Sequence, residues 1–499
     1  MKDNRNPTRK PVSRRDFLRL SGLAGGAAIL AVAGASCAPQ AVATQAPQAT
    51  QPAAAAATQA PAAANPTVAP TFVSMNPVPA TDQVEIEWWN QFSTPTCQTV
   101  FPQIIANFQK ENPKIVVKFE ISGGPPGGGD YTQILLARIA AGNPPDSITL
   151  WTGPSQFGAR GSLADIDQFM AVAKYAKPDA FYEGVLQSCK WNGKTYGLPA
   201  SAGDGCIFLN KKIFDAAGVS TKREDFPTTW DGLRALSQKF TKTENGAVTQ
   251  VGYVPFTGNS SWLKPVWSEL NGGKLFDPIA MQYKIDSPQN AEWLNYWVKW
   301  LKEEYGGDIE KLNQAGTWGD VYPNTGFAMG KAAMADSGAW ACTDAGIPFD
   351  WEVVKFPKGP SGSTLVNGFW PNWWALPKGT PHAQEAFLFS EYFCTVGWGY
   401  WYEQATMDMP AWKGFQRNTM NKALLNLVGK DRATDIQNFL LDYLDNTASM
   451  WTSPVEDFAN DTLNSMLDEV LHMKKPPEQS LKEAQALCQS KLDETLKGA

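Results

Sequence analysis

The chain has 499 residues, of which 18% are charged and 12% aromatic, and its formal net charge is −6. This length is sufficient for two domains with full cores. The negative charge argues against nucleic acid or an anionic membrane surface as the main partner. The only histidines, His382 and His472, argue against a histidine-based metal site. Twenty tryptophans are compatible with a large core and also with stacking on sugar rings, so composition allows both a binding protein and an enzyme.

The N-terminal residues have the pattern of an export signal. Ser13–Arg19, with the sequence SRRDFLR, resembles the twin-arginine signal, and the charge-free, Gly/Ala-rich stretch Leu20–Ser36 follows it. That stretch is short and weakly apolar for a permanent membrane span. An internal amphipathic helix is disfavoured because the basic residues lie at one end rather than along one face. We therefore expect a signal segment over residues 1–37.

A cysteine stands at the end of this segment. Gly34–Cys37, with the sequence GASC, resembles a lipoprotein processing site, in which Cys37 carries the acyl chains that hold the protein to a membrane. Gly34 departs from the motif, which prefers Leu or Val there, and simple cleavage is the alternative. We expect an exported protein that is lipid-anchored on the outer face of the cytoplasmic membrane.

Residues 38–83 are almost entirely Ala, Pro, Thr, Gln and Val. No packed face can be built from this composition. We expect an extended, solvated tether between the anchor and a globular body.

After the tether, strand and helix patterns alternate. Val84–Trp89, Ile115–Glu120 and Ser147–Trp151 have the apolar runs or alternation of strands. Between them, Phe101–Glu111 has helical spacing, and Asp130 can cap a second helix that runs to residue 141. The order strand–helix–strand–helix–strand predicts a parallel, doubly wound α/β sheet.

Longer helical patterns follow in the second half of the chain. Trp230–Thr241 and Pro288–Glu304 have helical spacing, and the second is expected to bury a face of Leu and Trp side chains. The portion from about Asp431 is expected to be mostly helical.

Two predicted strands end in an aromatic ring followed by polar groups. Trp89 and Asn90 lie at the end of the first strand, and Trp151 lies at the end of the third. Open parallel sheets bind ligands beyond the carboxyl ends of their strands, so these residues are candidate ligand contacts. The alternative is that both tryptophans are core residues, because aromatic residues favour strands.

A series of short segments, in chain order, resembles the motifs of one family. They are Asn143–Asp146 (NPPD), Gly193–Pro199 (GKTYGLP), Phe208–Phe214 (FLNKKIF), Ala216–Gly218 (AAG), Pro227–Asp231 (PTTWD), Phe327–Met334 (FAMGKAAM), Ser337–Trp340 (SGAW) and Met409–Ala411 (MPA). On these motifs the region from residue 84 to about 415 resembles the family 1 extracellular solute-binding proteins, the sugar-type binding components of ABC importers that resemble maltose-binding protein. Each motif is weak alone, and their order carries the resemblance.

The resemblance implies an α/β, two-lobed periplasmic-binding-protein fold whose hinge the chain crosses more than once. We expect lobe one at residues 84–198 and 360–404, and lobe two at residues 199–359 and 405–499. Cys206, Leu209 and the frequent Trp around residues 370–374 depart from the family pattern and leave the ligand's identity open.

The resemblance also implies site residues. Trp340 of the SGAW motif is expected to be a stacking platform, and Asn90 lies where the family often places a polar contact. Asp204 follows the first hinge crossing, where a carboxylate can accept sugar hydroxyl groups, although Gly203–Gly205 also reads as a solvated turn. Trp262 and Trp370 are further candidates, with core packing as the alternative.

The implied function is capture of a carbohydrate, an oligosaccharide in our reading, by a monomeric binding protein that delivers it to the transmembrane permease subunits of an ABC importer. No enzyme activity, cofactor, metal or nucleic-acid partner is expected. A secreted carbohydrate-active enzyme is an alternative, because the spacing of catalytic carboxylates cannot be judged from sequence. A surface lipoprotein with a docking role is the other alternative.

Six cysteines remain besides Cys37. In an exported protein six cysteines allow 15 disulfide pairings, and buried free thiols are the alternative. They are Cys97, Cys189, Cys206, Cys342, Cys394 and Cys488.

Overall fold

The computed structural model describes residues 83–120, 130–203, 205–256, 263–363, 371–443 and 452–498. The predicted signal segment, the tether, Cys37 and the candidate contacts Asp204, Trp262 and Trp370 lie outside the described residues. The chain divides into residues 1–73 and a compact unit of residues 74–499, and the fold below is that of the second unit.

The first sheet has five strands. They are β2 (Ile115–Phe119), β1 (Val84–Trp89), β3 (Ser147–Leu150), β14 (Trp373–Ala375) and β6 (Leu198–Pro199), in that spatial order. β1 pairs in parallel with β2 and β3, as the sequence predicts, whereas β14 runs antiparallel to β3 and β6. β14 reverses the direction because the chain returns to this sheet from the second one.

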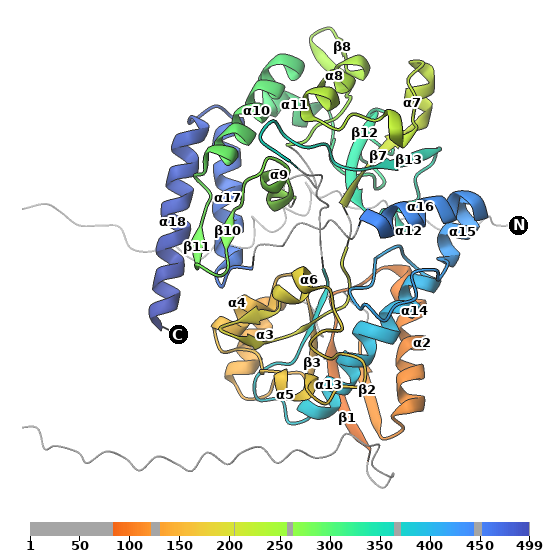
Figure 1. The fold of residues 1–499 in the computed structure, drawn as a ribbon, viewed down its shortest axis with the longest axis vertical. Helices are drawn as coiled ribbons and strands as arrows, with labels where there is room; N and C mark the ends of the chain where they lie inside the picture. The colour runs from red at the N-terminus through yellow and green to blue at the C-terminus, as the bar shows by residue number, and fades with distance from the viewer. Residues whose placement is uncertain are drawn as a thin grey trace, which may run out of the picture. The chain divides into compact units, whose positions relative to one another are not determined.

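Helices α2 (Pro95–Glu111), α3 (Tyr131–Ala140), α13 (Ala383–Tyr392) and α14 (Trp398–Gln404) accompany this sheet (Figure 1). Asp130 caps α3 through a hydrogen bond from the Gln133 amide, which confirms the predicted helix start. α2 begins before the predicted Phe101, because the Thr94 side chain caps it and proline, favourable in a first helical turn, follows.

The second sheet has three strands, in the order β12 (Met334–Gly338), β7 (Gly205–Asn210) and β13 (Trp351–Val354). β7 is antiparallel to both neighbours, in contrast to the parallel pairing of β1 with β2 and β3 in the first sheet. β7 is buried along its whole length. Helices α7 (Lys211–Ala216), α8 (Trp230–Phe240), α10 (Pro288–Tyr305) and α11 (Ile309–Ala315) accompany it (Figure 1).

The C-terminal part is helical, as predicted, with α15 (Lys422–Val428), α16 (Lys430–Tyr443), α17 (Glu456–Leu471) and α18 (Pro477–Gly498). α17 and α18 pack on each other and on α10. The predicted Leu and Trp face of α10 is buried, because Trp293, Trp297, Trp300 and Leu301 recur at helical spacing.

The remaining elements are short. They are α4 (Pro154–Ala159), α5 (Asp167–Met170), α6 (Glu183–Gln187), β4 (Lys190–Trp191), β5 (Lys194–Thr195), η1 (Arg223–Asp225), β8 (Lys242–Glu244), β9 (Ala247–Gln250), α9 (Lys264–Leu270), β10 (Phe276–Asp277), β11 (Gln282–Tyr283), α12 (Ala341–Asp344) and the π-helical segment η3 (Phe393–Gly397).

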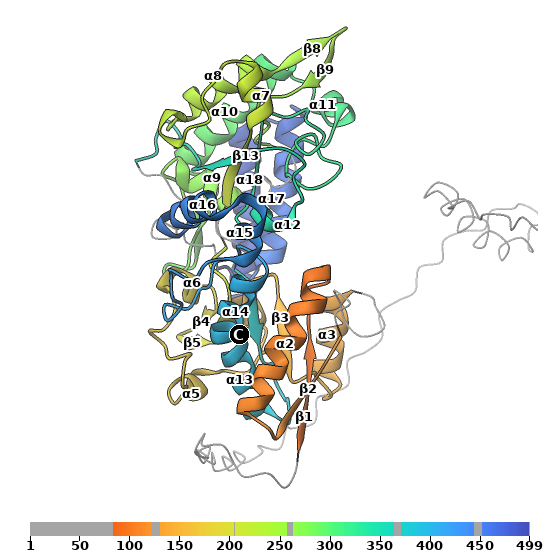
Figure 2. The ribbon, with the colours of Figure 1, turned by 90° about the vertical axis from the view of Figure 1, so that its right-hand side faces the viewer.

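The two sheets belong to two lobes, which are separate bodies in the two views of the ribbon (Figures 1 and 2). Three connecting segments lie side by side between them. The Ala200 amide donates to the Asn372 carbonyl (2.7 Å), and the Ala202 amide donates to the Met409 carbonyl (2.7 Å). The hinge region is therefore a small hydrogen-bonded unit built from residues far apart in the sequence.

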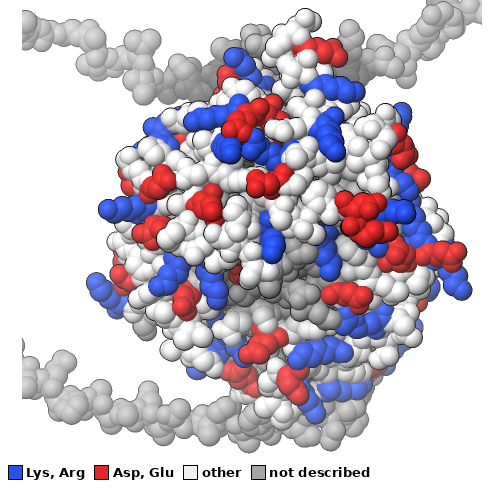
Figure 3. All heavy atoms as spheres, turned by 45° about the horizontal axis from the view of Figure 1, so that its top comes forward, with Lys and Arg blue, Asp and Glu red and all other residues white. Residues whose placement is uncertain are grey.

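Six cysteines in the described part of the chain are buried and free. Of the two alternatives left open by the sequence, the structure has buried thiols. No helix in the described ranges is long and apolar enough to cross a membrane. On the face shown in Figure 3, acidic and basic side chains are interspersed, without a patch of one sign.

Candidate ligand-binding site

Trp340 lies two residues after the end of β12, at the N-cap of the short helix α12. A β-carbon placed on Gly338 would lie 2.2 Å from atoms of the Trp340 ring, so the indole rests on the bare backbone of Gly338. Trp340 is half-buried. The ring packs against Gly338 on one side, and because Trp340 is only half-buried, part of its side chain stays accessible. This is the form of a stacking platform.

The surroundings of Trp340 hold the ring in place. Its side chain lies close enough to Tyr322 to lower the pKa of the Tyr322 hydroxyl. Its carbonyl oxygen accepts from the hydroxyl group of Thr343 (3.1 Å) and from that of Thr406 (3.5 Å), which lies on the third connecting segment. Trp340 is therefore linked to the hinge region as well as to its own lobe.

Three aspartates lie within electrostatic range of Tyr322. Burial raises the pKa of the Tyr322 hydroxyl, and Asp344, Asp320 and Asp408 raise it further. Asp320 has a left-handed backbone (φ 82°), and its Oδ1 accepts from the Ser337 hydroxyl (3.0 Å). We call Asp320, Asp344 and Asp408 the aspartate group.

Asp344 connects this group to the first lobe. Burial is the main reason that the pKa of Cys97, in the first turn of α2, is raised to about 11, and Asp344 adds to it. Asp344 itself is exposed, yet desolvation by the surrounding protein raises its pKa.

Asp408 lies in the hinge region with Ser201 and Asn372. Asn372 Nδ2 donates to the Ser201 hydroxyl (2.9 Å) and to Asp408 Oδ2 (3.0 Å). Asp408 is 5% exposed, and its Oδ1 has no hydrogen-bond partner among the described residues. Burial raises the pKa of Asp408 to about 8, and Asp344 adds to the shift.

A second aromatic ring lies at the end of β3 in the first lobe. Trp151 is 44% exposed and meets Phe92 edge-on, with ring centroids 6.0 Å apart. Of the three candidates at strand ends, Trp151 has the exposure that a ligand contact needs.

The residues after Trp151 contact the second lobe. The carboxyl group of Glu456, at the start of α17, lies 2.9 Å from the position of a β-carbon on Gly153, and the Asp457 amide donates to Gln156 Oε1 (3.4 Å). Glu456 is 4% exposed, and burial raises its pKa to about 8. Ser155 Oγ and Gln156 Nε2 are buried without a hydrogen-bond partner among the described residues.

The family model of the bacterial extracellular solute-binding proteins matches residues 93–398, more than half of the chain. The chain belongs to this family. It is 23% identical over 333 residues to the multiple sugar-binding protein of Streptococcus mutans, and this alignment covers 63% of the chain and 72% of that protein. It is 22% identical over 325 residues to an ABC transporter extracellular-binding protein of Pyrococcus horikoshii, covering 60% and 66%.

Solved structures of solute-binding proteins share the two-lobed fold. An ABC substrate-binding protein of Listeria monocytogenes, in complex with cycloalternan, superposes with a TM-score of 0.65 at 22% identity, over 83% of this chain and 100% of that one. UgpB of Mycobacterium tuberculosis, in complex with glycerophosphocholine, gives 0.64 at 18% identity, over 83% and 100%. At sequence identities this low, the structural similarity shows that the chain shares the fold of these proteins.

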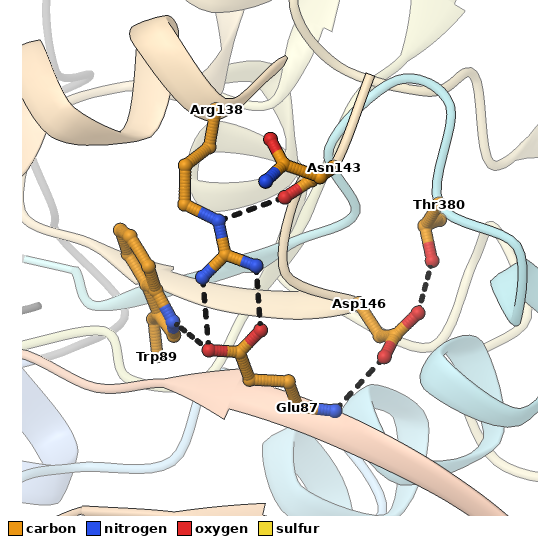
Figure 4. Close-up of polar contacts among 6 residues, drawn as sticks. All are labelled: Glu87, Trp89, Arg138, Asn143, Asp146 and Thr380. Atoms are coloured by element: carbon orange, nitrogen blue, oxygen red, sulfur yellow. Dashed lines mark hydrogen bonds and ion pairs between the residues drawn. The ribbon is translucent and has the colours of Figure 1, made fainter. Parts of the chain in front are cut away.

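Within this solute-binding protein, Trp89 is held in a structural network (Figure 4). Its indole Nε1 donates to Glu87 Oε1 (2.7 Å), and Arg138 lies over its ring and donates to both oxygens of Glu87. The family motif NPPD takes part through Asp146, which accepts from the Glu87 amide (2.8 Å) and from the Thr380 hydroxyl. Trp89 is 3% exposed, so we assign it to the first lobe's core.

Asn90 is fully buried, and its amide fixes the loop between β1 and α2. Nδ2 donates to the carbonyl groups of Phe92 (3.1 Å) and Glu120 (3.0 Å), while Oδ1 accepts from the Phe92 amide. These contacts occupy both amide protons, so Asn90 positions the loop rather than offering a donor to a ligand.

Sequence reasoning missed Tyr322, Asp344, Asp408 and Glu456. Asp344 lies four residues after Trp340, and this spacing, which places two side chains on one face of a helix, is the one local signal that could have found it. Asp408 and Glu456 carry no such signal, because their neighbours come from distant parts of the chain. No group of three or more His, Cys, Asp and Glu residues in the described ranges is arranged to hold a metal ion.

Proposed function

We propose that this protein is the extracytoplasmic solute-binding component of an ABC importer and that it captures a carbohydrate, as an oligosaccharide, between its lobes. The observation that supports this proposal is the position of Trp340. Its half-buried indole packs on Gly338 and lies beside Tyr322 and the aspartate group, at the hinge region. An aromatic platform with carboxyl groups beside it suits a sugar, whose ring faces are apolar and whose edges carry hydroxyl groups.

Relatives support the choice of ligand class. The Streptococcus mutans relative is named for binding multiple sugars, and the Listeria monocytogenes structure holds cycloalternan. Membership of the solute-binding family supports transmembrane permease subunits as the partners and binding without catalysis as the activity.

The placement of the protein is part of the proposal. The twin-arginine pattern, Cys37 and the tether favour a lipid-anchored monomer outside the cytoplasmic membrane, with lobe one at residues 84–198 and 360–404 and lobe two at residues 199–359 and 405–499. Replacing Cys37 with Ala should release the protein from membranes. Continued membrane association of that variant would count against the anchor.

A panel of purified mono- and oligosaccharides tests the function. A ligand present at about a hundred times its Kd should stabilise the protein by about 2.7 kcal/mol, which is visible as a thermal shift. Chromatography of each sugar after incubation should show it unchanged. Shortened products would favour a carbohydrate-active enzyme, and the absence of any shift with every sugar would remove the carbohydrate assignment.

A further inference from the structure

A contact outside the hinge region joins the two lobes. It lies between the start of α4, in the lower lobe of Figure 1, and the start of α17, in the upper lobe. The Asp457 amide donates to Gln156 Oε1 (3.4 Å), and Glu456 Oε2 lies 2.9 Å from the position of a β-carbon on Gly153. Because α4 and α17 belong to different lobes, moving the lobes apart at this point breaks both approaches.

Glu456 is enclosed where the two lobes meet. It is only 4% exposed, although it lies in the first turn of α17. The helix that it faces, α4, has the sequence PSQFGA and so contains no ionisable side chain. An ionised carboxylate buried without a basic partner costs far more free energy than a neutral carboxyl group does. The contact is therefore better suited to the neutral form of Glu456.

The titratable groups on the other elements packed against α17 stay neutral near neutral pH. Tyr283 of β11 and Cys488 of α18 are buried, and burial raises the pKa of both, that of Cys488 to about 11. The residues that α10 buries are uncharged, with Tyr305 as the titratable one, and burial raises the pKa of its hydroxyl as well. Burial raises the pKa of Glu456 to about 8, and the neighbouring Asp457 adds to the shift.

One basic side chain also reaches α17. Lys264 of α9 donates to Asn464 Oδ1 (3.0 Å), two turns along the helix from Glu456, and it contributes nothing to the shift of the Glu456 pKa. Glu456 is therefore the group of this contact whose charge changes as the pH passes through the neutral range.

We propose that the contact of Gly153 and Gln156 with Glu456 and Asp457 is a proton-controlled latch, which holds the lobes together while Glu456 is neutral and releases them when it ionises. Opening places the carboxyl group in water, where its charge is solvated, so opening and proton release are linked. The buried Gln156 Nε2 has no hydrogen-bond partner among the described residues and also gains water on opening. This cost keeps the contact closely balanced, so that one proton can shift it. The latch adds regulation to the proposed function and does not depend on which ligand is bound.

The direction of the pH effect follows from the two states of Glu456. In the open form its pKa returns to the ordinary value of 4.5, whereas in the contact it is about 8. A raised pKa favours the latched form fully below the lower value, and this advantage is lost as the pH rises to the upper one. Between them, the ratio of latched to open molecules should fall by at most about tenfold per pH unit.

Small-angle scattering of the protein without any sugar tests the latch. The radius of gyration should be smaller at about pH 5 than at about pH 9, because the latched form predominates at the lower pH. Glu456→Gln keeps the shape of the side chain and stays neutral. This variant should match the wild type at the lower pH and have the smaller radius at the higher one. Asp461→Asn, at an exposed position of the same helix, should follow the wild type at both.

The hinge carboxyl group of Asp408, whose pKa is also raised to about 8, is present in the wild type and in both variants. The difference between the wild type and Glu456→Gln at the higher pH therefore reports the latch alone, and a thermal melt at each pH checks that both are folded.

A wild-type radius that is the same at both pH values, or an increase that Glu456→Gln retains in full, would overturn the latch. Neither result bears on the proposed function, because no sugar is present and the panel of saccharides tests that function separately.

Discussion

The indole ring of Trp340 occupies the space that a side chain on Gly338 would take, since a β-carbon there would lie 2.2 Å from the ring. Gly338 is not among the glycines with positive φ, so its backbone conformation is open to other residues. The glycine of the SGAW motif is therefore required by the ring two residues later. This explains the glycine of the motif in physical terms, because only a residue without a side chain leaves room for the Trp340 ring.

Replacing Gly338 with Ala should displace the Trp340 ring and weaken sugar binding. We expect a loss of roughly tenfold to a hundredfold in affinity, because the stacked area is lost or misplaced. The free energy of unfolding should fall by about 1–3 kcal/mol, as is usual for overpacking. Calorimetric titration and chemical denaturation measure the two effects.

Gly184→Ala is the matched control, because a β-carbon on Gly184 meets no atom within 4 Å. In a Trp340→Ala background, Gly338→Ala should cause no further loss of affinity, since there is no ring left to displace. A full second loss in that background would show that Gly338 acts on something other than Trp340.

Binding of the sugar should bring the lobes together. A ligand that contacts both lobes binds the closed form more tightly and shifts the population toward it. Small-angle scattering should report a smaller radius of gyration at saturation, and a sugar that gives no thermal shift should leave the curve unchanged. An unchanged curve at saturation with a proven ligand would exclude hinge closure.

Glu456 should make the stability of the protein depend on pH. Its pKa is raised by burial, and further by Asp457, from 4.5 to about 8. The folded protein keeps this proton while the unfolded chain releases it, so the free energy of unfolding should fall as pH rises between these two values. One such group contributes at most about 1.4 kcal/mol per pH unit.

Glu456→Gln should remove this contribution, because an amide keeps the shape of the side chain and does not titrate. The variant should match the wild type near about pH 5 and exceed it in stability near about pH 9, measured by chemical denaturation. Asp461→Asn, at an exposed position on the same helix, should follow the wild type at both. Parallel curves for wild type and Glu456→Gln would refute the buried, protonated state of Glu456.

Local patterns predicted most of the first sheet and little of the hinge region. The alternation of Ile115 and Val117 and the cap at Asp130 are local signals, and the structure confirms both. β14 is antiparallel to β3 because the chain returns to the first sheet from the second sheet, and no local sequence pattern predicts that path. The same limit applies to the polar cluster of Ser201, Asn372 and Asp408, in which Asn372 lies 171 residues from Ser201 and 36 residues from Asp408 along the chain.

The candidate site residues likewise divide into those that a local sequence pattern identified correctly and those that it did not. Trp340 could be chosen because a motif surrounds it, and Trp151 because it follows a strand. The same strand-end argument selected Trp89 and Asn90, which are buried and used by the first lobe. Alternation along a strand sets which residues face the core, but at a strand end the following loop decides whether a side chain stays exposed.

The measurement that tests the central claim most directly is calorimetric titration of Trp340→Ala beside the wild type, with a thermal melt of each. If the indole lies under a sugar ring, its removal should cost on the order of 2–3 kcal/mol of binding free energy, roughly a hundredfold in affinity, at about 25 cal/mol per Å² of buried apolar area. The melting temperature without ligand should change little, since Trp340 is only half-buried. Unaltered affinity together with a large loss of stability would contradict the account and return Trp340 to the core.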